Sequence, residues 1–270
     1  MQVSFFGTYG PSGSFPPPSV RSTEMTATAI MYTQFGFAVA ADGRQRWENQ
    51  ATRDEYVRQS ESETTQKIFS FTRGNTSLAY VVRGHIANRD RSFDMGFELQ
   101  NQLDSWRFGD ANLGGLLQRT AVNLETYIKT AQRNLQIEDL PTTFMDLLGY
   151  IGTQPFWVEL QFQRVPNPRT GRLFEINSRP LPHGFCIVSG SLIIRDLIWH
   201  GQFSEFCDTV NYRRSLQDAI RFVKGYIDAC CSPMALQFDP TCEEFGGHVH
   251  AATIVPMGGF RWAPGLGPIT

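Results

Sequence analysis

The chain has 270 residues, of which 41% are hydrophobic, and a formal net charge of −2 from 24 basic and 26 acidic residues. This balance provides no basic surface for nucleic acid or an anionic membrane, and we expect neither partner. The five cysteines are odd in number and lack C-x-x-C spacing, which argues against a disulfide framework or a zinc ribbon and suits a cytoplasmic protein.

The first 25 residues differ in composition from the rest. They contain YGPSGSFPPPS, where prolines among glycine and serine favour extended or turn conformations without a packed core. We therefore expect residues 1–25 to be a leader, 26–262 to form a single domain and 263–270 to be a C-terminal tail.

Two hairpins follow the leader. TATAIMYT and FGFAVAA are short β-rich runs divided at residues 34–36, and KIFSF and SLAYVVRG flank TRGNT, whose Gly-Asn suits a tight turn. Between the hairpins, residues 43–66 are too charged to be buried. We expect them to form a surface excursion.

The middle of the chain turns helical and then returns to strands. Apolar residues recur at three-and-four spacing over 112–134 and more weakly over 90–107, which predicts two neighbouring helices. Three strands are expected in 156–165, 172–178 and 185–191. Another helix is expected to start near Ser215, which forms a capping box with Asp218, and a last strand covers 248–256. Because strands are grouped, this order predicts an α+β fold of antiparallel sheets covered by helices.

Several separated motifs together resemble one known family. They are T-x-T-x-x with A-A-D-x-R between Thr26 and Arg44, the lysine opening KIFSF, the glycine of VVRGH, FCIVSGS and GGHVHAATIV. In order and approximate spacing they resemble proteasome β-type subunits and their simpler bacterial relative that works with an unfoldase ATPase, both N-terminal-nucleophile hydrolases. The resemblance implies a four-layer αββα sandwich of two antiparallel sheets.

The resemblance also implies an activity and partners. The expected activity is a threonine-type endopeptidase acting on peptides or unfolded proteins, within a homo-oligomeric ring that has an ATPase partner. No cofactor is expected. Acylase-like chemistry on a small amide remains an intermediate alternative, because substrate pockets are built from variable loops.

The chemistry explains why such a site needs these residue types. A threonine hydroxyl requires an adjacent base, which an N-terminal threonine carries as its own α-amine. By resemblance, Thr26 is nucleophile and base, Lys67 its activator and Asp42 the carboxylate that orients the lysine. Gly84 would supply an oxyanion-stabilising N–H, typically worth about 2.7–4 kcal/mol. Ser189 would support the site by hydrogen bonding, and all five form the expected catalytic set.

Each of these residues also has a purely structural interpretation, and Thr26 could be an ordinary strand threonine behind a disordered arm. Asp42 precedes Gly43 and could be a turn residue, and Lys67 could be a solvated lysine at a strand start. Gly84 could merely permit close backbone approach. Ser189 belongs to Ser-Gly-Ser, which suits a strand-to-helix turn with an N-cap serine.

The residue before Thr26 leaves two alternatives open. Met25-Thr26 matches the start of the simpler bacterial type, which loses only its initiator methionine, so residues 1–24 could be an over-extended gene start. The rival is a propeptide that is removed or retained.

The segment TCEEF, residues 241–245, departs from the family pattern. Active members carry an aspartate and then a serine before Gly-Gly, where this chain aligns Cys242 and Phe245; Glu243 or Glu244 could substitute only if the loop shifts. This favours the alternative of a catalytically inactive proteasome-like subunit that serves assembly or binding.

A metal site is not expected. His248 and His250 would share a strand face, but the sequence offers no third ligand at a fixed spacing. Cys230 and Cys231 follow a helical run and are expected to be free, mostly buried thiols.

Overall fold

The structure is a computed structural model that describes residues 26–48, 58–84, 94–106, 113–131, 143–163 and 166–269. The expected leader, residues 1–25, lies outside the described residues. No helix in the described part of the chain combines the length and apolarity needed to cross a membrane.

The first sheet gathers strands from both ends of the chain. Its order is β10-β1-β2-β11-β12, and all its pairings are antiparallel. The strands are β1 (Thr28–Thr33), β2 (Gly36–Ala41), β10 (Cys186–Ser189), β11 (His250–Val255) and β12 (Gly259–Trp262). The C-terminal strands therefore lie beside the first hairpin, with β11 paired directly to β2.

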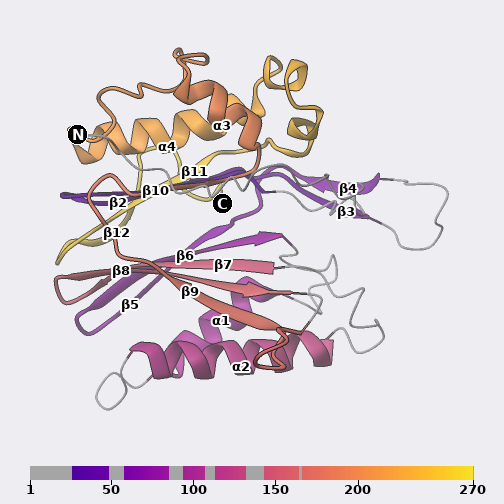
Figure 1. The fold of residues 1–270 in the computed structure, drawn as a ribbon, viewed down its shortest axis with the longest axis vertical. Helices are drawn as coiled ribbons and strands as arrows, with labels where there is room; N and C mark the ends of the chain where they lie inside the picture. The colour runs from indigo at the N-terminus through magenta and orange to yellow at the C-terminus, as the bar shows by residue number, and fades with distance from the viewer. Residues whose placement is uncertain are drawn as a thin grey trace.

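The second sheet is an antiparallel meander of consecutive strands, β5 to β9. The strands are β5 (Ile68–Arg73), β6 (Thr76–Gly84), β7 (Thr143–Ile151), β8 (Gln154–Phe162) and β9 (Phe174–Ser178). A separate two-stranded hairpin pairs β3 (Gln45–Glu48) with β4 (Arg58–Ser62) and extends beyond one end of the first sheet (Figure 1).

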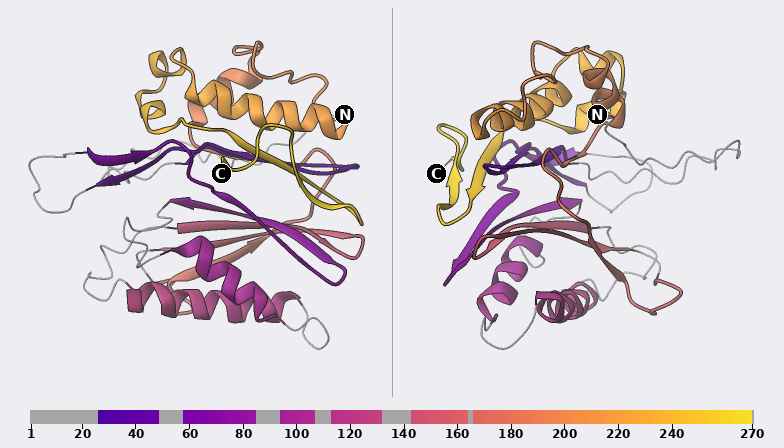
Figure 2. Two further views of the ribbon diagram at one scale, coloured as in Figure 1. Left: turned by 180° about the vertical axis from the view of Figure 1, so that it is seen from behind. Right: turned by 60° about the vertical axis from the view of Figure 1, so that its left-hand side comes forward.

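The elements stack in four layers, as the views in Figures 1 and 2 show. Helices α3 (Leu192–Trp199) and α4 (Leu216–Cys231) cover the first sheet, and α1 (Met95–Asp104) and α2 (Leu113–Ala131) cover the second. The expected α+β fold with two antiparallel sheets is confirmed. The described elements lie in the order helices, sheet, sheet, helices.

Three apolar clusters fill the spaces between these layers. One lies between the second sheet and its helices, one between the first sheet and its helices, and one between the two sheets. In the cluster between the sheets, Ile30, Val39 and Ile254 of the first sheet face Ile68 and Val81 of the second. Packing on both faces explains why the central strands are apolar throughout rather than alternating.

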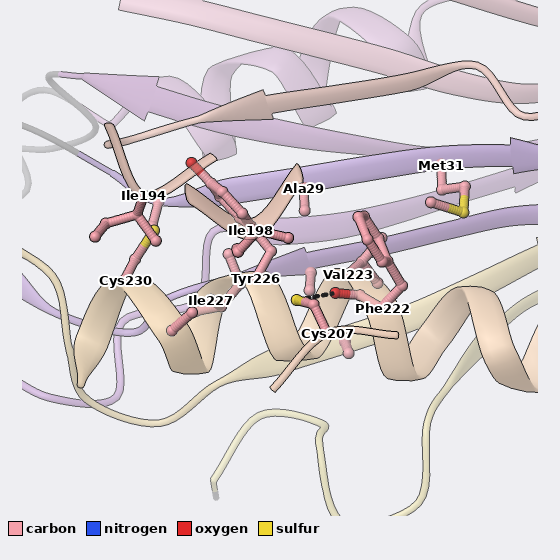
Figure 3. Packing of buried hydrophobic residues seen from close by; sticks show 14 of the residues in the cluster. Ala29, Met31, Ile194, Ile198, Cys207, Phe222, Val223, Tyr226, Ile227 and Cys230 are labelled. Carbon is pink, nitrogen blue, oxygen red and sulfur yellow. Dashed lines mark hydrogen bonds between the residues drawn. The ribbon is translucent and has the colours of Figure 1, made fainter. Parts of the chain in front are cut away.

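Helix α4 is the main cover of the first sheet. Ser215 caps it by accepting a hydrogen bond from the Asp218 amide at 3.0 Å, as the capping-box pattern predicted. Its buried face, which includes Val223, Tyr226 and Ile227, packs against Ala29 and Met31 of β1 (Figure 3). Alanines such as Ala29 and Ala40 on the strands let the helix approach closely, which brings the Tyr226 hydroxyl into contact with the end of β10.

Sequence reasoning missed three parts of this fold. No strand was expected over 143–151 (β7) or 259–262 (β12), and the charged excursion 43–66 contains strands β3 and β4. Strand β7 is buried on both faces, so it lacks alternation, and β3 and β4 are polar apart from Trp47. The expected tail begins with Ala263, whose amide donates to the Ala251 carbonyl at 2.9 Å, so this part of the tail is bound to β11.

Candidate functional site

The residues before β1 and after β2 meet at one end of the first sheet. The Ala27 amide donates to Asp42 Oδ1 at 3.0 Å, and the Asp42 amide donates back to the Ala27 carbonyl at 3.1 Å. The antiparallel pairing of β1 and β2 requires this proximity, because Thr28 stands opposite Ala41. Asp42 therefore holds the peptide unit that immediately follows Thr26.

A buried ion pair joins this end of the first sheet to the second. Lys67 Nζ lies 2.8 Å from Asp42 Oδ1, and the two side chains are 1% and 0% exposed. Burial raises the pKa of the Asp42 carboxyl, and the Lys67 ammonium, followed by the Gly246 and Ala27 amides, opposes that rise. Three donors on one carboxylate favour its charged form, which the 2.8 Å ion pair with Lys67 requires. The turn interpretation of Asp42 and the solvated interpretation of Lys67 do not fit this burial.

The Lys67 ammonium uses two of its three N–H groups on protein acceptors. Besides Asp42 it donates to the Arg44 carbonyl at 2.6 Å. Among the described residues it has no third hydrogen-bond acceptor, and it makes no hydrogen bond to the Thr26 hydroxyl. Lys67 and Thr26 are linked instead through the Asp42 oxygen that also binds the Ala27 amide. Thr26 is 7% exposed.

The Gly246-Gly247 loop closes over Asp42 from a distant part of the chain. The Gly246 amide donates to Asp42 Oδ2 at 3.3 Å, and its carbonyl accepts from the Gly43 and Arg44 amides at 3.0 and 2.9 Å. Gly247 has a φ of +75°, and a Cβ there would lie 2.3 Å from the Glu63 carbonyl oxygen. Only glycine fits such a position without displacing the backbone.

Ser189 binds the start of β1 from the neighbouring strand. Its hydroxyl lies 2.6 Å from Thr28 Oγ1 and donates to the Thr26 carbonyl at 3.2 Å. Tyr226 of α4 donates to the carbonyls of Ser189 and Ser191, each at 3.1 Å, so the helix fixes the strand end. Ser191 caps α3, as the strand-to-helix interpretation of Ser-Gly-Ser predicted.

In the described residues no hydrogen bond joins Gly84 to Thr26, Asp42 or Lys67. It ends β6 with a φ of +80°, opposite Thr143. Two residues earlier, the Val82 amide donates to the Lys67 carbonyl at 3.1 Å. Gly84 thus belongs to the strand beside Lys67, and its oxyanion role stays a prediction.

Sequence reasoning missed the carboxylate that the TCEEF region supplies. Asp239 Oδ2 accepts from the Ser191 hydroxyl at 2.5 Å, and Asp239 caps the 3₁₀ helix η3 (Pro240–Glu244). Cys242 is buried in that helix, and Phe245 lies 3.3 Å from where a Cβ on Gly190 would stand. The Asp-Pro-Thr sequence, an N-cap followed by proline, was the available signal.

A histidine pair lies on β11 and the residues just before it, beside the end of β2. His250 is 0% exposed, and its ring centroid is 4.9 Å from that of His248. Burial, then His248, then the Lys67 charge lower the pKa of His250 to about 4, so the imidazole is neutral at pH 7. Among the described residues no cluster of three or more His, Cys, Asp or Glu could bind a metal ion.

This arrangement can activate a nucleophile at the start of β1. An ammonium held by a buried carboxylate provides fixed positive charge beside the Thr26–Ala27 peptide. Such a charge favours the deprotonated form of a neighbouring hydroxyl. The described residues contribute this electrostatic part of the site, and the nitrogen of Thr26 is available as a base only when the Met25–Thr26 peptide bond is cut.

Comparisons with known proteins identify related folds. No family model matches the chain, and no curated protein matches it. Two solved structures match with a TM-score of 0.50: the helical assembly of the Anbu complex from Pseudomonas aeruginosa, at 15% identity, and an Anbu (Gly-1) mutant from Hyphomicrobium sp. strain MC1, at 12% identity. Each match covers 88% of this chain and 86% of the other. Anbu (ancestral beta-subunit) from Yersinia bercovieri is also similar, at 14% identity, the same coverage and a TM-score of 0.49.

These matches correct the family resemblance drawn from the motifs. The motifs pointed to proteasome β-type subunits and the simpler bacterial peptidase, and that assignment is wrong as stated, because the similar solved structures are Anbu proteins. The spacing of the motifs could not separate these groups of proteins, because the motifs mark only the paired strands of the fold. At this identity the Anbu structures show the fold.

Breaking the buried pair should destabilise the protein strongly. Lys67→Met or Asp42→Asn alone leaves a buried polar group without its partner, and each should lower the free energy of unfolding by about 3–5 kcal/mol. The double variant should lose clearly less than the sum of the two. Urea unfolding of all four proteins measures the coupling.

A surface pair provides the control for this cycle. Arg221 and Asp218 lie 3.3 Å apart with the arginine 71% exposed, and Arg221→Ala should cost less than about 1 kcal/mol. Additive effects of the Asp42 and Lys67 substitutions would contradict the pairing.

The buried imidazole predicts a loss of stability in acid. In the unfolded chain His250 protonates near its ordinary pKa of about 6.5, whereas the folded protein keeps it neutral to about pH 4. The unfolded state therefore binds more protons between these values, and stability falls as the pH falls. From about pH 7 to pH 4 the wild type should lose about 2–3 kcal/mol more than His250→Phe. Urea unfolding of both proteins across this range measures the difference, and equal losses would refute it.

Proposed function

We propose that this chain is a threonine-type peptidase in which Thr26, once freed of residues 1–25, is an N-terminal nucleophile that hydrolyses peptide bonds. The observation that carries the proposal is the buried Lys67–Asp42 pair, whose carboxylate also binds the amide of Ala27, the residue after Thr26. The pairing supports the proposal because it holds a positive charge, through one carboxylate oxygen, against the peptide unit that follows Thr26. A catalytic role would also account for keeping a lysine in a buried position, which is energetically costly.

The proposed reaction uses the two ends of Thr26. Its α-amine, released when the Met25–Thr26 peptide bond is cut, accepts the hydroxyl proton as Oγ1 attacks the substrate carbonyl. The positive charge of Lys67 stabilises the alkoxide character of Oγ1, and an N–H at Gly84 stabilises the oxyanion. The amine then gives its proton to the leaving group, and water hydrolyses the acyl-enzyme.

The proposal extends to the assembly, the partner and the cellular compartment of the protein. The solved Pseudomonas aeruginosa relative is a helical assembly of the Anbu complex, which supports an assembly of several copies of this chain, in a ring or a related arrangement. An ATPase that delivers peptides or unfolded proteins fits the proposed activity. All five cysteines are free, which suits the cytoplasm, and we keep residues 26–262 as one catalytic domain.

A second candidate is a non-catalytic subunit of the same fold that serves assembly or binding. The TCEEF region favours it, because the buried Cys242 and Phe245 stand where active relatives were expected to carry an aspartate and a serine. Asp239 supplies a carboxylate, but it binds Ser191 rather than Thr26.

Labelling with a threonine-directed epoxyketone separates the two candidates. In protein with a free Thr26 amine, the peptidase proposal expects one adduct, located by mass spectrometry at Thr26, because the reagent bonds to both the hydroxyl and the amine. Thr26→Ala should abolish it, and Lys67→Ala should slow it by about 10²-fold or more.

Matched substitutions on the surface control for general effects. Thr64→Ala and Lys129→Ala change an exposed threonine and a half-exposed lysine on α2, and both variants should label as the wild type does. A free Thr26 amine with no adduct would support the non-catalytic candidate.

A further inference from the structure

His250 lies on the same row of the first sheet as the residues around Thr26. In the strand register His250 stands opposite Ala41, Ala41 opposite Thr28, and Thr28 opposite Ser189. Directly paired residues point to the same face of a sheet. That face is the one toward the second sheet, because Ala41 belongs to the cluster between the sheets. The imidazole is therefore on the inner face of the site, two strands from Thr28.

Both ring nitrogens of this buried imidazole are without a protein partner. Neither Nδ1 nor Nε2 of His250 has a hydrogen bond to any described residue, although the side chain is fully buried. Its ring neighbours do not supply one: His248 directs Nε2 to the Gly267 carbonyl at 2.9 Å, and Trp262 makes a ring contact at 6.1 Å. Buried polar groups in native proteins are nearly always hydrogen-bonded, so these nitrogens point to a small bound partner.

The Lys67 ammonium also lacks one hydrogen-bond partner among the described residues. It binds Asp42, which follows Ala41, the residue that stands opposite His250 in the strand register, and its charge contributes to the lowered pKa of the imidazole. It is not a hydrogen-bond partner of the ring. One of its N–H groups has no acceptor among the described residues. The shared partner must accept from an ammonium and also bond to a neutral imidazole, and a water molecule does both. A metal cation does not fit beside the ammonium charge.

We propose that His250 is a positioning residue that holds one internal water molecule between its imidazole and the Lys67 ammonium. The water satisfies the third N–H of Lys67, which fixes the direction of the ammonium relative to Asp42 and Thr26. This role rests on the proposed function, because it matters for rate only if Thr26 reacts. The water itself is independent of catalysis.

A high-resolution crystal structure of the full wild-type chain tests the water directly. The expected result is one ordered water about 3 Å from both a His250 ring nitrogen and Lys67 Nζ. A direct bond from the ring to a protein atom, or a dry space between the two side chains, would overturn the proposal.

Rates of epoxyketone labelling at Thr26 test the positioning role. His250→Phe keeps the ring shape without nitrogens and should slow labelling about tenfold, because small misplacements of a reacting group are costly. His250→Gln can still bind a water and should stay within about threefold of the wild type. Equal rates in all three proteins, or equal slowing by both substitutions, would refute the role. An unreactive wild type would refute the peptidase instead, and the crystal structure would still decide the water.

Discussion

One buried carboxylate organises the candidate site. Asp42 accepts hydrogen bonds from the Lys67 ammonium and from the Ala27 and Gly246 amides. It therefore joins three segments that are far apart in the sequence, which precede β1, β5 and β11. A charge is costly in such a place unless it is paired and fully hydrogen-bonded. The site geometry is therefore fixed by the same interaction that connects the two sheets at this end.

The helix and loops that pack around the site explain why the carboxylate stays in place. Small strand residues let α4 pack closely on the first sheet, and Tyr226 then binds the carbonyls on either side of Gly190. This leaves the Ser189 hydroxyl on the start of β1, while Asp239 binds Ser191 from the opposite loop. Packing of the helix layer thus reaches Thr26 through hydrogen bonds to the backbone.

Sequence patterns predicted the parts of this arrangement that depend on local order. Short apolar runs gave most strands, and the Ser215 cap and the helical spacing gave the helices. Asp42 and Lys67 were expected together, and they do meet. The rest depends on contacts between distant parts of the chain, which sequence patterns do not show. Strand β7 has no alternation because both of its faces are buried, and Asp239 binds a serine 48 positions away. His250 stands opposite Ala41, the residue before Asp42, only because β11 pairs with β2.

The central claim is that Thr26 becomes a chain terminus beside the Lys67–Asp42 pair. The most direct test is the mass of the intact protein purified from its native cell, with the N-terminal peptide sequenced by tandem mass spectrometry. The account predicts a chain that begins at Thr26 with a free amine. A protein that retains residues 1–25 in every copy would contradict it, because the base of the proposed reaction would then not exist.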